Sequence, residues 1–150
     1  MPLFVVQAGA ASPSNSTKVP CQIATTSTKT CKIVAFDISF DGVTAAATPI
    51  EVQIARATGA SSGGSSFTPL LVSADTSATS STTARVNDTT AGSSPTKLAS
   101  WYVAPTSGFS YQWPLGREIQ CKISEFYELK IVTVTGSGTP NYQAQLWFEE

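Results

Sequence analysis

The sequence predicts an all-β protein, an antiparallel sandwich of two sheets with a jelly-roll-like course. Short segments alternate apolar and polar residues, which is the pattern of strands with one buried and one solvated face. Clusters of Gly, Pro, Ser and Asn separate these segments, as turns require. No stretch combines a helical apolar period with capping residues over about ten positions. Many short strands without helices favour two packed sheets, arranged as a jelly roll or as an immunoglobulin-like sandwich.

In the first half of the chain, residues 48–56 carry the clearest strand pattern. Ile50, Val52 and Ile54 fall on one face, and polar residues fall on the other. Residues 31–40 begin as a continuous apolar run, then alternate, and an Asp-Gly turn closes them. Shorter apolar segments complete this half. The strands expected here are residues 3–8, 19–24, 31–40, 48–56 and 67–72.

In the second half, residues 127–135 are rich in β-branched side chains and end at the turn cluster of residues 136–141. Residues 142–148 alternate cleanly after that turn, so the two segments are predicted to form a hairpin. Residues 118–123 alternate in the same way. The strands expected here are residues 98–104, 108–113, 118–123, 127–135 and 142–148.

Two long Ser/Thr-rich stretches, residues 58–66 and 73–95, are almost free of charge and of bulky side chains. Because they bury little apolar area, we expect them to be exposed loops, either facing solvent or ordered against partner subunits. Residues 1–19 are expected to form an extended N-terminal arm, with residues 12–16 as its flexible joint. Residues 20–150 then form a single β-sandwich domain, a length for which one core suffices.

The composition argues against an enzyme. The 150 residues include no histidine, nine Lys and Arg, and ten Asp and Glu. Proton transfer and metal ligation near neutral pH draw first on histidine and on clustered charges. Without a histidine, no Ser-His or Cys-His nucleophile can be assembled. No phosphate-binding or dinucleotide-binding glycine motif occurs either. We therefore expect no catalytic residue, no cofactor and no metal site.

The acidic residues are the remaining candidates for chemistry. The candidates for a pair of glycosidase carboxylates are Glu51, Glu118, Glu125 and Glu128. Glu51 and Glu118 fall on the polar phase of expected strands, so a solvated sheet face is the preferred interpretation. The aspartates are separated singletons without the spacing of a calcium loop.

Charge and hydropathy limit the partners. The net charge is −1 and the few cations are scattered, so no basic stripe is available for nucleic acid. No apolar run approaches the length of a membrane helix, and the N-terminus lacks the basic and apolar regions of a leader. We expect a soluble protein made without a leader, with neither nucleic acid nor a membrane as its partner.

The chain has three cysteines, Cys21, Cys31 and Cys121, in no metal-binding spacing. Buried thiols that pack as small apolar side chains are the preferred interpretation. The alternative is a cross-strand bridge between Cys21 and Cys31, which lie on segments that could form neighbouring strands.

An aromatic cluster spans Trp101, Tyr102, Phe109, Tyr111 and Trp113. Core packing is the default interpretation. Because exposed Trp and Tyr also anchor protein interfaces and stack on sugars, an interface and a carbohydrate platform stay open as alternatives.

Three stretches give a sharper indication: residues 37–52 (DISFDGVTAAATPIEV), residues 113–118 (WPLGRE) and residues 144–150 (AQLWFEE). In this order they resemble a family of small structural proteins of tailed bacteriophages, the capsid decoration or cement proteins. The resemblance implies a non-enzymatic virion protein with a β-sandwich or jelly-roll protomer. It further implies assembly in the host cytoplasm, attachment to the outer capsid surface, and the major capsid protein as partner, commonly through a homotrimer that bridges capsid subunits and stabilises the shell.

On this interpretation the apolar start of the arm would add as an edge strand to a neighbouring subunit, and the aromatic cluster would contribute to the same interface. The alternative from a different class is a carbohydrate- or receptor-binding module, as in a tail fibre or an adhesin. Such a module would bind its sugar through exposed Trp side chains. The predicted interface residues are Leu3, Phe4, Val5, Val6, Trp101, Tyr102 and Trp113.

Overall fold

The computed structural model describes residues 1–11, 17–41, 48–72, 77–132 and 140–150. Within these ranges the chain forms twelve β-strands and no helix. The strands are β1 (Leu3–Ala11), β2 (Lys18–Ala24), β3 (Cys31–Phe40), β4 (Ile50–Ala57), β5 (Ser65–Phe67), β6 (Leu70–Leu71), β7 (Thr83–Asp88), β8 (Thr96–Val103), β9 (Gly108–Gln112), β10 (Ile119–Cys121), β11 (Phe126–Ile131) and β12 (Tyr142–Glu149).

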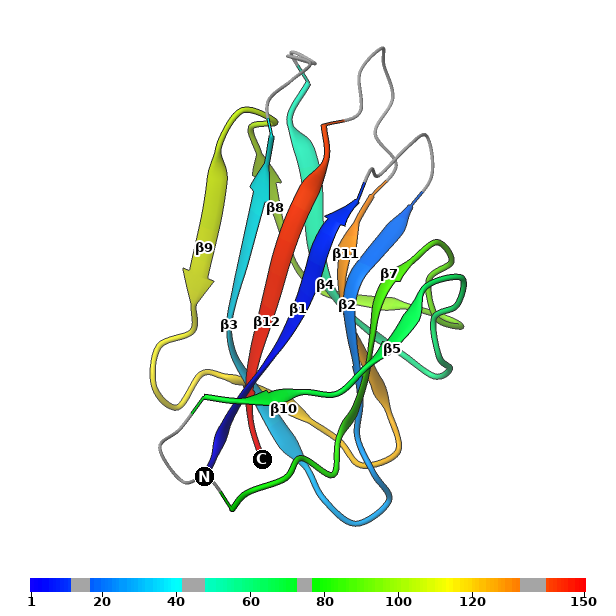
Figure 1. The fold of residues 1–150 in the computed structure, drawn as a ribbon, viewed down its shortest axis with the longest axis vertical. Coiled ribbons are helices and arrows are strands. Elements are labelled where there is room, and N and C mark those ends of the chain that lie inside the picture. Colours follow the sequence, from blue (N-terminus) through cyan, green and yellow to red (C-terminus); the bar gives the residue numbers. More distant parts are fainter. Residues whose placement is uncertain (12–16, 42–47, 73–76, 133–139) are drawn as a thin grey trace.

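The strands form two antiparallel sheets that pack face to face (Figure 1). Sheet A has the order β10-β3-β12-β1-β6, and β9 pairs with β3 on the same side as β10. Sheet B has the order β5-β7-β2-β11-β4-β8. The predicted all-β sandwich of two sheets is confirmed.

The strand order is that of a jelly roll. Pairing joins strands from opposite ends of the chain: β1 with β12, β2 with β11, β3 with β9 and β4 with β8. The chain therefore follows the path of one long hairpin that is rolled up, because β12 also pairs with β3 and β11 also pairs with β4. The other strands, β5, β6, β7 and β10, extend the two sheets.

Alternate residues of both sheets fill the space between them. On β4, the side chains of Ile50, Val52 and Ile54 are buried, as the period of a strand requires. Sheet A contributes Phe4 and Phe148, whose ring centroids lie 5.6 Å apart. Full burial of each such side chain contributes about 1.5–3 kcal/mol. The result is one core that runs between the two sheets.

The N-terminal segment is not the extended arm that the sequence predicts. It is strand β1, which lies inside sheet A between β12 and β6. Phe4, Val5 and Val6 are at most 4% exposed, so the apolar run is satisfied within the protein and is not available to add to a neighbour. Leu3 is half-buried at the start of the strand. The expected joint at residues 12–16 lies outside the described residues.

The Ser/Thr-rich stretches are not simply exposed loops either. They contain β7 and the first two residues of β5, and three of their polar residues, Ser61, Thr82 and Asp88, are at most 3% exposed. Small side chains permit this because the backbone of the loops can approach the sheet closely. Residues 73–76 of the second stretch lie outside the described residues.

The C-terminal hairpin predicted from residues 127–135 and 142–148 is wrong. Strand β11 lies in sheet B between β2 and β4, whereas β12 lies in sheet A between β3 and β1, so the two strands do not pair. The connection between them, residues 133–139, lies outside the described residues.

Candidate functional site

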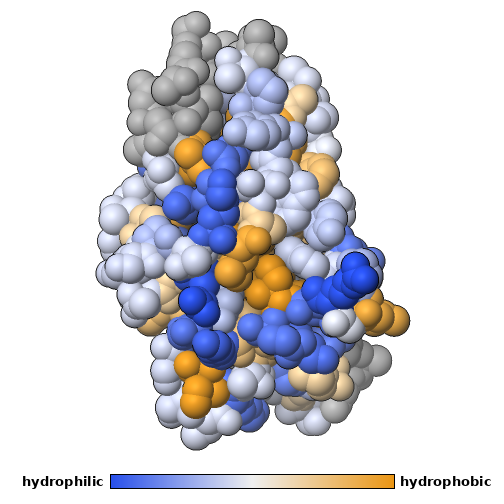
Figure 2. All heavy atoms as spheres, turned by 180° about the vertical axis from the view of Figure 1, so that it is seen from behind, coloured by the Kyte–Doolittle hydropathy of each residue, from blue (hydrophilic) through white to orange (hydrophobic). Residues whose placement is uncertain are grey.

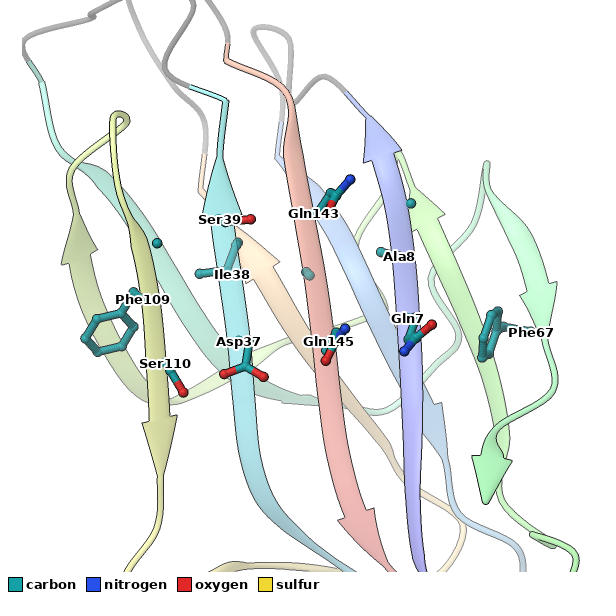
Figure 3. A pocket seen from close by; sticks show the side chains of 13 residues that line it. Gln7, Ala8, Asp37, Ile38, Ser39, Phe67, Phe109, Ser110, Gln143 and Gln145 are labelled. Atoms are coloured by element: carbon teal, nitrogen blue, oxygen red, sulfur yellow. The ribbon is translucent and has the colours of Figure 1, made fainter. Parts of the chain in front are cut away.

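The outer face of sheet A carries an open depression of about 690 Å³. Strands β9, β3, β12 and β1 cross it side by side (Figure 3). Because alternate residues of these strands enter the core, the polar residues between them point outward. The pairing register aligns four of these residues in one row across the sheet: Gln7, Gln145, Asp37 and Ser110.

Small residues keep this depression open. Gly9 and Gly108 line it, and a side chain added at Gly9 would meet nothing within 4 Å. Gln143 and Ser39 pair in register next to the first polar row. Phe67 and Phe109 lie at opposite ends of the depression (Figure 3).

Uncharged hydrogen-bonding groups dominate the depression. Asp37 accepts a hydrogen bond of 3.1 Å from Nε1 of Trp147, which orients its carboxylate. Over the part of the chain that the structure describes, the side chains of Gln7, Gln145 and Ser110 have no hydrogen-bond partner. Amides and hydroxyls both donate and accept, so this surface is chemically suited to a neutral ligand rich in hydroxyl or amide groups.

The aromatic cluster closes one side of the core. Phe36 of β3 is fully buried, and the rings of Trp101, Phe109, Tyr111 and Trp113 surround it with centroid distances of 4.9 to 6.3 Å. These four rings are only partly buried, but they pack against Phe36 and against one another. Trp101 and Trp113 therefore pack against the core, as the default interpretation expects.

Tyr102 is the exception among the aromatic residues of β8. Its side chain is 74% exposed, and it lies opposite Glu51 at the outer surface of sheet B. On the same strand, Leu98 is 43% exposed. Strand β8 ends sheet B and pairs only with β4 among the described strands. Figure 2 views the molecule from the opposite side to Figure 1 and shows apolar patches among hydrophilic residues.

A buried polar network anchors the loops that cover part of sheet B. Asp88 is fully buried and accepts two hydrogen bonds of 2.9 Å from the guanidinium of Arg85. It also accepts hydrogen bonds from the hydroxyl of Ser61 and from the backbone N–H of Gly64, the latter at 2.7 Å. Asn87, with a φ of 56°, adopts the left-handed conformation that Asn tolerates.

Glu128 lies in the same covered region, but no Lys or Arg of the described ranges forms a salt bridge with it. Its Oε1 accepts hydrogen bonds from Nε2 of Gln22 at 2.8 Å and from the backbone N–H of Gly92 at 2.6 Å. Its Oε2 is buried without a hydrogen-bond partner among the described residues. Burial therefore raises the pKa of the Glu128 carboxyl group.

The four glutamates that were candidates for a catalytic pair each have a different environment. Glu51 lies 3.3 Å from Nζ of Lys97, and Glu118 accepts a hydrogen bond from the N–H of Gly116. Glu125 accepts one from the hydroxyl of Tyr127, while Glu128 is buried under the loops. No three Cys, Asp or Glu side chains of the described ranges gather as metal ligands.

The three cysteines are buried, and their positions do not allow the disulfide between Cys21 and Cys31 that was the alternative interpretation. Cys21 lies on β2 in sheet B, whereas Cys31 lies on β3 in sheet A, so these two strands are not neighbours. The Cys21 thiol faces the carbonyl oxygens of Val6 and Ala144, at 3.7 and 3.9 Å. Burial raises its pKa to about 12. Cys31 instead lies directly opposite Cys121 of β10.

Comparisons with protein-family models, with curated proteins and with solved structures found no significant match to this chain. None of the described residues belongs to a helix long and apolar enough to cross a membrane.

Proposed function

We propose that this protein is a non-enzymatic virion structural protein, a capsid decoration protein that binds the outer surface of a phage head and bridges its major capsid subunits. The resemblance of three sequence stretches to that family is one support. A jelly-roll body with ten acidic and nine basic residues also suits a protein that binds neutral protein surfaces. Many weak contacts repeated on a symmetric lattice would supply the strength of attachment.

The exposed edge strand β8 is the observation that carries this proposal. It spans eight residues, and only one of them, Lys97, is charged. Leu98 and Tyr102 expose apolar surface beside a strand edge that has no partner among the described strands. Natural proteins usually protect such edges with charges or cover them, because another chain can add to them. We therefore assign β8, with Tyr102 as its aromatic anchor, to the contact with the shell or with a second copy.

Co-sedimentation with phage shells stripped of accessory proteins tests the proposal, after light scattering has given the oligomeric state. We expect a homotrimer that pellets with the shells and raises their disruption temperature. Tyr102→Ala should weaken binding roughly 30-fold or more, because truncated aromatic anchors lose about 2 kcal/mol or more. Ile123→Ala is the matched control, since Ile123 is 48% exposed in the turn after β10. A wild-type protein that stays in the supernatant would overturn the proposal.

The depression on sheet A favours a second candidate function, a carbohydrate- or receptor-binding module. Its row of amide, hydroxyl and carboxylate groups matches sugar hydroxyls, whereas Trp101 and Trp113 are engaged in the aromatic cluster. A glycan array decides between the two candidates. Binding to a glycan that is lost in the Gln145→Ala variant and kept in the Trp101→Phe variant would favour the carbohydrate-binding module. Retention on no glycan would remove it.

A further inference from the structure

Cys31 and Cys121 form a thiol pair across two adjacent strands. Cys31 begins β3, Cys121 ends β10, and the two residues are direct partners in the antiparallel register. Residues opposed in this way have Cα atoms about 4.5–5.5 Å apart, which lies inside the range that a disulfide spans. The Cys121 thiol also contacts the backbone oxygen of Ile119, at 3.8 Å.

The surroundings of the pair determine how it can be reached. Both side chains are at most 2% exposed and belong to the core. The neighbouring Cys31 thiol and burial raise the pKa of the Cys121 thiol, so the closed pair reacts slowly. Strand β10, however, has only three residues and pairs only with β3 among the described strands. Lys122 and the residues just after it are exposed, so local opening of this short strand is sufficient for access.

We propose that Cys31 and Cys121 form a cross-strand disulfide when the protein meets a small-molecule disulfide such as oxidised glutathione. The thiolate of Cys121 attacks one sulfur of the oxidant, and one glutathione thiolate leaves. The thiolate of Cys31 then attacks the protein sulfur of this mixed disulfide, and the second glutathione leaves. The two cysteines lose two electrons and two protons, which the departing pair of glutathione thiols carries away.

The consequence is a clamp on the edge of sheet A. The disulfide would tie β10 to β3 and close a loop from residue 31 to residue 121. Such a long loop restricts the unfolded chain strongly, so the cross-linked protein should melt about 10 °C higher than the reduced one. The inference does not depend on the proposed function. In a particle assembled in a reducing cytoplasm, the clamp would form only after release.

The test treats the native, reduced protein with oxidised glutathione, then blocks free thiols with N-ethylmaleimide after unfolding. We expect the intact mass to show one blocked thiol, that of Cys21, in place of three. Trypsin cuts after Lys29 and Lys32, so the cross-link should join the peptide Thr30-Cys31-Lys32 to residues 118–122. Residues 19–29, which hold Cys21, should stay unlinked.

Two variants separate this pair from general thiol chemistry. Cys21→Ala should form the same cross-link and show the same rise in melting temperature. Cys121→Ala should form no cross-link and keep one melting temperature with or without the oxidant. A cross-link that appears only in denaturant would overturn the proposal, and so would native protein that gains glutathione without closing the bridge or stays fully reduced at equilibrium in oxidised glutathione.

Discussion

Gln22 and Gln145 occupy comparable places on opposite outer faces of the sandwich. Each lies on a central strand and points away from the core, Gln22 on β2 of sheet B and Gln145 on β12 of sheet A. Gln22 is nevertheless only 1% exposed, and its side chain forms hydrogen bonds with Glu128 and with the N–H of Ser61. Gln145, in contrast, lines an open depression. The same residue type is therefore structural on one face and available to a ligand on the other.

The loop that contains Gly92 causes this difference, because it lies over the outer face of sheet B. Gly92 comes so close to the sheet that a side chain there would collide with the backbone oxygen of Gly59 and with Glu128. The N–H of Gly92 consequently reaches Oε1 of Glu128. On sheet A, Gly9 has open space around it and nothing covers the polar row within the described ranges. Polar side chains on a sheet thus stabilise the fold only where the backbone of another segment supplies their partners.

The largest expected effect comes from removing residues 1–11, which would take a central strand out of sheet A. This truncation removes Phe4 and Val6 from the core and leaves β12 unpaired on one side. We expect no cooperative unfolding transition by circular dichroism, because each lost side chain alone contributes about 1.5–3 kcal/mol. Removal of Met1 alone, which is 68% exposed, is the control and should leave unfolding unchanged. A cooperative transition in the long truncation would restore the view of this segment as an arm.

On sheet B, Asp88→Ala should lower the free energy of unfolding by about 3–5 kcal/mol, because it leaves the guanidinium of Arg85 without its buried partner. It also removes the acceptor for Ser61 and Gly64, which hold the loop in place. Asp37→Ala on sheet A is the matched control. Among the described residues that carboxylate accepts one hydrogen bond, from Nε1 of Trp147, so its removal should lower the free energy of unfolding by about 1 kcal/mol. Urea unfolding measures both variants. Equal losses of unfolding free energy would contradict the difference between the covered face of sheet B and the open face of sheet A.

Two buried glutamates should give opposite pH dependence. Burial acts to raise the pKa of Glu150, but hydrogen bonds from Ser81, Ser80 and the N–H of Thr82 outweigh it and lower this pKa to about 2. Its ordinary value is about 4.3, so its contribution to stability is present above that pH and is lost as the pH falls towards 2. We expect Glu150→Gln to remove about 1–2 kcal/mol at neutral pH and to flatten the acid limb of a stability curve measured by urea unfolding.

Glu128 behaves in the other direction because its folded pKa is raised. Its contribution is greatest below the ordinary pKa of a glutamate, where the group is neutral in both states, and is lost as the pH rises through the folded pKa. Glu128→Gln keeps the acceptor oxygen for Gln22 and Gly92 and removes the buried charge. This variant should therefore match the wild type near pH 4 and exceed its stability at pH 8. A loss of stability at pH 8 would contradict the assignment.

The sequence was informative where large apolar residues alternate and silent where distant segments meet. Residues 31–40, 48–56 and 142–148 match β3, β4 and β12 closely, because their branched and aromatic side chains alternate at the strand period. The apolar start of β1 was visible, but its partner β12 lies at the far end of the chain and local pattern does not specify such pairing. Strand β7 was missed because its inward residues include the small Ala84, which gives little contrast with the surrounding Ser and Thr.

The candidate site was less predictable than the fold. Trp101 and Trp113 stood out by residue type, yet both pack against Phe36. Tyr102, the third predicted interface residue of this cluster, is exposed. The polar row on sheet A is spread over four strands, and only their register brings Gln7, Gln145 and Ser110 together. Outward phase on each strand was readable from the sequence, but alignment across strands required the topology.

The smallest expected effect on stability comes from Gln145, the counterpart of Gln22 on the outer face of sheet A. Gln145→Ala removes a side chain that has no hydrogen-bond partner in the described structure, so the free energy of unfolding should change by less than about 0.5 kcal/mol. Gln22→Ala leaves the N–H of Ser61 without a partner and removes one of the two hydrogen bonds that Oε1 of Glu128 accepts, so it should lower the free energy of unfolding by about 2 kcal/mol. Urea unfolding of the two variants side by side measures what the covering loop adds. Equal losses would mean that the depression on sheet A is held by contacts of its own, and that its polar row is part of the fold and not a surface kept for a ligand.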